Sequence, residues 1–139
     1  MIIKDIKEWI KATYITMDEY MNDDNELIPF LYGYIKRPTI VCTDDFSFSA
    51  QGGIGNYSDP REFCDNYEDL EIGFPTNFDD PEFSNNDGQI CCYVTIEDIQ
   101  KVIERHGYID VEKSGILGLK YNNAKKYKRE EKLKRIINI

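Results

Sequence analysis

The start of the chain alternates apolar and charged residues with the period of an amphipathic helix. Apolar residues from Ile3 to Met17 recur every three or four positions, and lysine and glutamate side chains fill the opposite face. The pattern predicts a first helix that ends near Thr13, because the β-branched residues around it favour strand. Thr16, with Glu19 three positions later, predicts the capped start of a second short helix.

The clearest helix pattern lies in the second half of the chain. Thr95 is a good N-cap residue, Asp98 follows it at the third helical position, and apolar residues from Ile96 to Ile103 recur at helical spacing. Gly107 predicts the end of this helix, since glycine readily adopts the left-handed backbone that closes many helices.

Two more helices are predicted from weaker patterns. Asp59 as N-cap, Pro60 at the first helical position and Glu62 at the third indicate a short helix that reaches about Asn66. Near the end of the chain, residues 124–137 are strongly charged and predict a helix with few apolar anchors.

Strands are predicted where apolar and polar residues alternate or where β-branched residues gather. Residues 39–43 and 46–51 predict a hairpin around a turn at Asp44 and Asp45. Residues 70–74 alternate in the same way and predict a further strand.

The remaining strands complete the predicted fold. Residues 89–94 predict a strand directly before the clearest helix, and residues 108–112 and 116–121 predict a terminal hairpin. Together the elements predict an α+β fold. We expect a small mixed or antiparallel sheet of four to six strands, two or three packed helices and a basic C-terminal helix.

Length and composition fit one domain. With 139 residues, 41% of them hydrophobic, the chain can bury a core without metal or disulfide staples. We therefore expect residues 1–139 to form a single domain with a basic helical tail over 120–139. No stretch has the apolar run of a signal peptide or the roughly 18 apolar residues of a membrane span. This predicts a cytoplasmic protein with no membrane partner.

Charge is distributed unevenly along the chain. The net charge of −9 combines +6 over residues 120–139, from eight bases and two acids, with −15 over residues 1–119. Residues 44–87 hold twelve acids and one base, Arg61. Such a surface would repel nucleic acid and attract a basic protein, so we expect a protein partner and no direct contact with nucleic acid. The candidate partner-binding residues are Asp44, Asp45, Asp65, Glu68, Asp69, Asp79, Asp80, Glu82 and Asp87.

The single base of the acidic segment supports an alternative hypothesis. Arg61 lies four positions after Tyr57, and both follow the glycine-rich stretch 52–55. An arginine can hold a phosphate while an aromatic ring stacks on a base, so Tyr57 and Arg61 are candidates for binding a small nucleotide. The glycine-rich stretch itself lacks the lysine of a P-loop and the third glycine of a dinucleotide fingerprint, and it predicts a flexible turn.

The residue types that usually support catalysis or metal binding form no recognisable set. The cysteines are Cys42, Cys64, Cys91 and Cys92. They show no C-x-x-C spacing, so we expect free, buried or half-buried thiols. His106 precedes Gly107 at a helix end, where a cation interacts well with the helix dipole. Residues 85–88 resemble part of a calcium loop, but Phe83 and Val94 occupy its first and last ligand positions. We therefore expect no enzyme activity, no cofactor and no metal.

Short motifs follow one another between residues 30 and 110. They are Phe46-Ser47-Phe48-Ser49-Ala50-Gln51, Tyr57-Ser58-x-Pro60-Arg61-Glu62, Tyr67 with Glu71-x-Gly73-x-Pro75, Tyr93-Val94, and Ile99 with Ile103-Glu104-x-His106-Gly107. This pattern resembles a group of small uncharacterised proteins of bacteriophages and mobile elements of low-GC bacteria. The chain departs from that pattern in the glycine-rich insertion at 52–55 and at Tyr108, where a second glycine is usual. The resemblance implies a phage or mobile-element origin and no particular activity.

These observations favour a binding protein over an enzyme. The leading hypothesis is an acidic phage or mobile-element protein that inhibits a host defence system. It would present carboxylates where DNA phosphates lie and so occupy a basic, nucleic-acid-binding surface of a host protein. The alternative is sequestration of a small nucleotide signal of such a system. Ten Tyr and seven Phe also favour an interface, which points to a homodimer.

Overall fold

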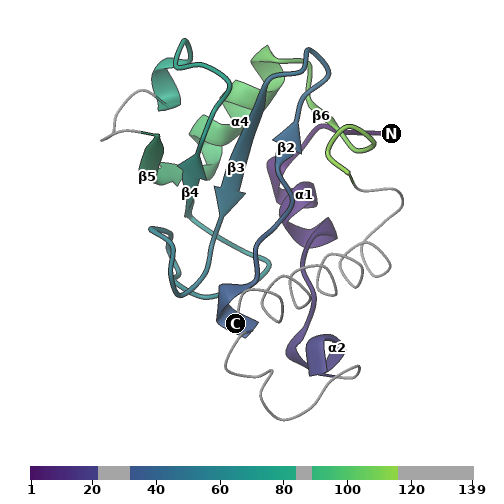
Figure 1. Cartoon of the computed structure of the whole chain (residues 1–139), viewed down its shortest axis with the longest axis vertical. Coiled ribbons are helices and arrows are strands. Elements are labelled where there is room, and N and C mark those ends of the chain that lie inside the picture. Colours follow the sequence, from purple (N-terminus) through teal and green to yellow (C-terminus); the bar gives the residue numbers. More distant parts are fainter. Residues whose placement is uncertain (22–31, 84–88, 116–139) are drawn as a thin grey trace, which may run out of the picture.

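The computed structural model describes residues 1–21, 32–83 and 89–115. Its elements confirm the predicted α+β class (Figure 1). In chain order they are β1 (Ile2–Ile3), α1 (Ile6–Ala12), α2 (Met17–Met21), the 3-10 turn η1 (Tyr32–Tyr34), β2 (Ile40–Val41), β3 (Ser47–Gln51), β4 (Asp69–Gly73), the 3-10 turn η2 (Pro81–Phe83), β5 (Ile90–Thr95), α4 (Ile96–Arg105) and β6 (Ile109–Asp110). The predicted strand 116–121, the helix 124–137, the basic tail 120–139 and Asp87 fall outside the described residues.

The main sheet has four antiparallel strands in the order β2-β3-β4-β5. Its first two strands form the predicted hairpin, with Ile40 opposite Phe48. The predicted turn is confirmed as well, because the N–H of Cys42 donates to the carbonyl of Phe46 at 2.8 Å and Asp45 adopts a left-handed φ of 73°.

Helices α2 and α4 begin at the capping residues that the sequence predicts. Asp98 N donates to Thr95 Oγ1 at 3.2 Å at the start of α4, and Glu19 N donates to Thr16 Oγ1 at 3.1 Å before α2. Helix α1 ends at the predicted Thr13, but Ile3 lies in β1 instead of the helix. Among the described residues no helix is both long and apolar enough to cross a membrane.

One predicted helix is wrong, and one predicted strand is shorter than expected. The predicted helix after Asp59 is an irregular loop. A side chain forms hydrogen bonds with backbone groups that a helix would pair with one another. Tyr67 Oη donates to the Glu62 carbonyl at 2.7 Å and accepts from Cys64 N at 2.9 Å. The strand predicted over 108–112 is present as the shorter β6, which pairs with β1 at the other end of the chain, and its predicted hairpin partner 116–121 lies outside the described residues.

One face of the main sheet is covered by helices. Figure 1 shows α4 passing behind the sheet, and the main core joins sheet residues such as Phe48 and Ile72 to Trp9 of α1 and Ile99 of α4. A smaller aromatic cluster joins Ile15, Tyr20, Ile35 and Phe63. The alternate residues of β3 and β4 point away from the core, and none of the described helices covers that opposite face of the sheet.

Candidate partner-binding surface

Three of the predicted partner-binding carboxylates are paired with basic side chains at the end of α4. Asp44 Oδ2 lies 2.6 Å from His106 Nδ1, and Asp80 Oδ2 lies 2.8 Å from His106 Nε2. Arg105 binds Glu82 through both terminal nitrogens, at 2.9 and 3.0 Å, and also pairs with Asp80. The Asp80 side chain is only 3% exposed. These three carboxylates therefore stabilise the fold, and we leave them out of the candidate surface.

His106 lies at the C-cap of α4, as predicted, but its carboxylate partners come from distant loops. Its ring stacks on Phe46 with the centroids 3.9 Å apart. Burial alone would lower the pKa of His106, but the hydrogen bonds to Asp44 and Asp80 outweigh burial and raise the pKa above its ordinary value of 6.5. Both ring nitrogens are engaged by carboxylates, so this imidazole joins two loops to the end of α4.

Two other predicted carboxylates, Asp45 and Asp79, lie apart from each other on different loops. Asp45 pairs with Lys113 at 2.8 Å on the far side of the hairpin turn. Asp79 is exposed in the loop before η2, beside the buried Asp80. Their neighbours in the chain, Asp44 and Asp80, are both bound to His106.

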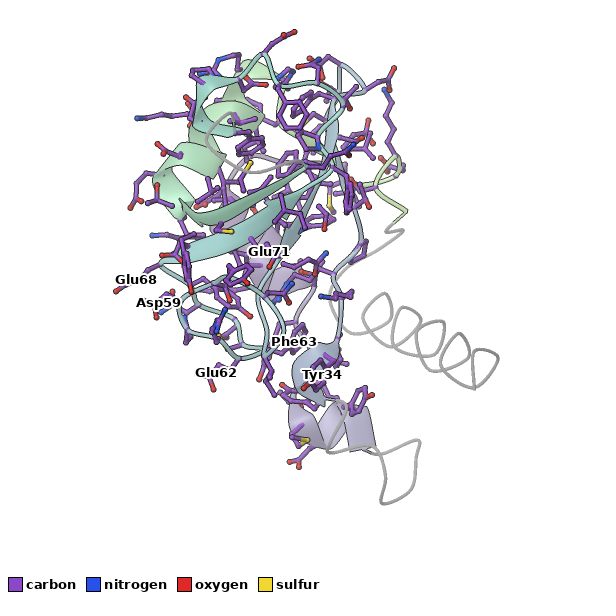
Figure 2. All side chains as sticks on the ribbon, turned by 60° about the vertical axis from the view of Figure 1, so that its left-hand side comes forward. Tyr34, Asp59, Glu62, Phe63, Glu68 and Glu71 are labelled. Carbon is purple, nitrogen blue, oxygen red and sulfur yellow. The ribbon has the colours of Figure 1, made fainter. Side chains whose placement is uncertain are left out.

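A group of carboxylates gathers between residues 59 and 71. Figure 2 shows Glu68, Asp59 and Glu62 along one margin of the molecule and Glu71 further in, over the sheet. None of the group forms an ion pair with a described residue. Sequence reasoning named half of the group and missed the rest. We call this group the acidic surface; its residues are Asp59, Glu62, Asp65, Glu68, Asp69 and Glu71.

The fold forces like charges together on the acidic surface. The N–H of Glu68 donates to the carbonyl of Asp59 at 2.9 Å, and Asp59 forms a bridge with Asp69. Burial, and then the charges of Asp59 and Glu68, raise the pKa of Asp69 above its ordinary value of 3.8. Among the described residues, Asp69 Oδ1 is also buried without a hydrogen-bond partner. The ionised form of Asp69 therefore costs the fold free energy.

Arg37 anchors the loop that presents the acidic surface. Its guanidinium is buried and donates from Nη2 to the carbonyls of Cys64, at 2.7 Å, and of Ile10, at 3.1 Å. It also lies over the Phe63 ring, 4.5 Å from the centroid. The arginine thus ties the end of α1 to the loop. Sequence reasoning missed Arg37, because its position next to Pro38 indicates only an element boundary.

The structure brings the two candidate nucleotide-binding residues together. The Arg61 guanidinium lies 4.9 Å from the centroid of the Tyr57 ring, and Arg61 Nε donates to the carbonyl of Asn56 at 3.2 Å. Tyr57 is 47% exposed and makes an edge contact with the exposed Tyr93, with centroids 6.0 Å apart. A cation and two aromatic rings therefore lie side by side next to the acidic surface.

The glycine-rich stretch before Tyr57 forms the predicted turn, and close packing explains its glycines. A Cβ on Gly52 would lie 2.2 Å from the Tyr67 ring, and a Cβ on Gly53 would lie 2.6 Å from the carbonyl oxygen of Gly33. The N–H of Ile54 donates to that same carbonyl at 3.0 Å. The glycines let the turn pack against η1 and the loop of the acidic surface.

A groove opens on the uncovered face of the main sheet. Its volume is about 300 Å³, and its lining combines polar groups with two apolar side chains. Lys36 Nζ donates to Asn56 Oδ1 at 3.2 Å, and Tyr57 N donates to Glu71 Oε2 at 2.7 Å at its edge. We call it the sheet groove; its lining includes Lys36, Arg37, Ser49, Asn56, Glu71, Gly73 and Phe74.

The four cysteines are all free thiols. Burial, followed by the charges of Asp44 and Asp80, raises the pKa of Cys42 to about 12. Cys91 and Cys92 point to opposite faces of β5, as predicted, but Cys92 is exposed where a half-buried thiol was expected. Within the described ranges, no three His, Cys, Asp or Glu side chains are arranged to hold a metal ion.

The resemblance to phage and mobile-element proteins stays a prediction. No family model, curated protein or solved structure matches the chain.

Proposed function

We propose that this chain is a non-enzymatic binding protein of phage or mobile-element origin that acts in the bacterial cytoplasm. It inhibits a host defence system by covering a basic, nucleic-acid-binding surface of a host protein. The observation behind this proposal is the acidic surface, whose six carboxylates pair with no described base. Such charges attract a basic surface over about 8–10 Å at physiological salt.

The free-energy cost of ionised Asp69 supports a binding role for the acidic surface. Its raised pKa means that the ionised side chain destabilises the fold at neutral pH. A residue that costs stability is expected where binding needs the charge.

Exposed aromatic side chains next to these carboxylates fit a protein partner. Tyr57, Phe74 and Tyr93 are 47%, 65% and 48% exposed. Aromatic anchors surrounded by polar groups are typical of the centres of protein–protein interfaces. The neighbouring carboxylates would select a basic partner over a neutral one.

The proposal is tested by phage plating on bacteria that each carry one defined defence system. Where the chain restores plating, the purified nuclease of that system is assayed with and without it at rising salt. Inhibition should weaken steeply with salt, because the contacts are exposed charges. The triple variant Asp59→Lys, Glu62→Lys and Glu68→Lys should lose inhibition.

A matched control separates the acidic surface from net charge. Glu8, Asp18 and Glu97 are also exposed, and their reversal to lysine changes the net charge equally on other elements. This control variant should inhibit like the unchanged chain. Equal loss in both variants, or full inhibition by the acidic-surface variant, would rule the proposal out.

The pairing of Arg61 with Tyr57 supports a second candidate function, the sequestration of a small nucleotide signal. Here a phosphate would bind the guanidinium and a base would stack on an exposed ring. Calorimetry with cyclic mono- and dinucleotides tests it. Arg61→Ala and Tyr57→Ala should each abolish the binding heat, whereas the acidic-surface reversals should not weaken it.

A further inference from the structure

The sheet groove adjoins the acidic surface, and Glu71 belongs to both. Ser49 and Gly73 are paired across β3 and β4, so they share the face of the sheet that the helices leave uncovered. At about 300 Å³ the groove is at the small end of the roughly 300–1,000 Å³ range of ligand pockets. That volume suits one long side chain better than a dinucleotide.

Gly73 leaves space in the groove that the fold does not need. A Cβ added there would meet only Ser49 Cβ, at 3.8 Å, which is ordinary van der Waals contact. Its φ also lies outside the left-handed region, so the backbone does not require glycine. Glycine within a strand is unfavourable, and it often marks a place where a ligand or another chain approaches closely.

Two exposed aromatic residues, Phe74 in the lining of the groove and Tyr93 against Tyr57, adopt an unfavourable backbone. Phe74 has a φ of 52° and Tyr93 a φ of 54°, although neither is glycine. Left-handed backbone is rare for bulky residues, and exposed rings gain little from packing in return. Such outliers are found at binding sites, where the side chain has to be presented to a ligand.

Glu71 is the one carboxylate in the lining of the groove, beside Lys36 and Arg37, and the Arg37 guanidinium is turned to the carbonyls of Ile10 and Cys64. Glu71 Oε2 accepts a hydrogen bond from Tyr57 N, and the carboxylate has no ion pair with a described residue. The Tyr57 ring already holds the guanidinium of Arg61 at 4.9 Å, so the rings here suit a guanidinium face. Lys36 Nζ donates to Asn56 Oδ1, and its charge opposes a cation in the groove.

We propose that the sheet groove receives an arginine or lysine side chain of the protein partner, with Glu71 as its counter-charge and Phe74, Tyr57 and Tyr93 as its aromatic rim. This inference rests on the proposed function, since it specifies how a basic partner is held. The acidic surface attracts the partner, and the groove fixes one of its side chains.

The test is a titration of the isotope-labelled full chain, followed by the amide NMR signals. The probe is a capped glycine–serine peptide with a central run of arginines, and the control peptide has citrulline instead. The arginine peptide should shift the amides of Glu71, Gly73 and Phe74, and the citrulline peptide should not. Gly73→Val, which fills the groove without a backbone penalty, should weaken arginine-peptide binding about tenfold and leave the melting temperature unchanged.

Two further variants keep the test independent of folding. Phe74→Gly relieves the left-handed backbone, so it should melt at the same or a higher temperature while binding more weakly. Lys36→Gln removes the opposing charge and should strengthen binding. Weaker binding in Lys36→Gln, or shifts of the groove amides by adenosine monophosphate in place of the peptide, would overturn the proposal in favour of a phosphate ligand. Self-association that is lost in Phe74→Gly would overturn it in favour of a second copy.

The nuclease assay separates this inference from the proposed function. If Gly73→Val and Phe74→Gly inhibit normally while the triple acidic-surface variant does not, the proposed function stands and the groove assignment is wrong. If the groove variants fail and the acidic-surface variant inhibits, the partner is recognised without the long-range charge attraction that we propose.

Discussion

Asp80 and His106 lie 26 positions apart in the sequence, yet Asp80 Oδ2 and His106 Nε2 are 2.8 Å apart. Asp44 holds the other ring nitrogen, so one imidazole joins the hairpin turn, the loop before η2 and the end of α4. Because the pKa of His106 is raised above 6.5, its stabilising contribution is complete below about pH 6.5 and is lost as pH rises through the higher folded value.

Asp44 sets the acidic limit of the same network. Burial alone would raise the pKa of Asp44, but hydrogen bonds from His106 and Phe46 outweigh burial and lower the pKa below 3.8. Its contribution is therefore present above about pH 3.8 and is lost as pH falls through the lower folded value. The network should stabilise the fold most between these two limits.

His106→Gln checks this window. Near pH 5.5 the variant should lose about 1–3 kcal/mol, the usual cost of leaving a buried charged group such as Asp80 with fewer donors. The difference should shrink at alkaline pH, where His106 is neutral. Urea unfolding followed by the fluorescence of the buried Trp9 measures both values. A difference that stays constant from acid to alkaline pH would show that the charge on His106 is unimportant.

Gly107 and Gly115 are two left-handed glycines whose alanine variants separate the backbone cost of a Cβ from its steric cost at the end of α4. Both have a left-handed φ, of 85° and 79°, but a Cβ on Gly107 would lie 2.0 Å from Thr43 Oγ1, while a Cβ on Gly115 would meet nothing within 4 Å. Gly115→Ala should cost only the backbone penalty of about 1–2 kcal/mol. Gly107→Ala should cost clearly more, as measured by urea unfolding. Equal losses would mean that Thr43 moves aside freely.

Local patterns predicted the elements whose ends are fixed by near neighbours. Thr95 and Gly107 mark the two ends of α4, and both could be recognised because a cap and a left-handed residue act within one turn of the helix. The pair Tyr57 and Arg61 was predictable for the same reason, since the two residues are close in the chain. The hairpin between residues 39 and 51 likewise depends on its own turn.

The remaining features depend on contacts between distant segments. The strand β6 pairs with β1 at the other end of the chain, a contact that no local pattern in the sequence indicates. The helix predicted after Asp59 has favourable capping residues, yet the hydroxyl of Tyr67 binds its backbone instead. The division of the carboxylates into paired and unpaired groups followed from tertiary contacts of Arg105 and His106, which charge counts along the sequence do not contain.

Asp69→Asn should stabilise the protein at neutral pH. Burial, Asp59 and Glu68 raise the pKa of Asp69, so the ionised form is disfavoured in the fold and an amide removes that cost. We expect a gain of about 0.5–2 kcal/mol, as is usual when surface charges are optimised. The gain should vanish as pH falls below about 3.8, where the carboxyl is protonated in both states. Asp79→Asn, at an exposed position, should change stability by less than about 0.5 kcal/mol. A loss of stability in Asp69→Asn would contradict the repulsion inferred here.

Arg37→Met should weaken both the fold and the acidic surface. Methionine fills much of the space of the arginine, but it leaves the carbonyls of Ile10 and Cys64 without their donor. Removing a buried cation that has no carboxylate partner among the described residues offsets part of this cost, so we expect a net loss of about 1–3 kcal/mol.

The position of Arg37 predicts a local effect beyond that loss. Amide hydrogen exchange of Cys64 and Tyr67 should accelerate more than that of α4, because the arginine anchors the loop of the acidic surface to α1. Inhibition should fall although Arg37 is only 2% exposed and cannot itself touch a partner. Lys36→Met, one position earlier and with its amine outside this cluster, serves as the control and should leave the exchange of these amides unchanged. Uniform acceleration across the whole chain in Arg37→Met would show that the arginine stabilises the core in general and does not position the surface.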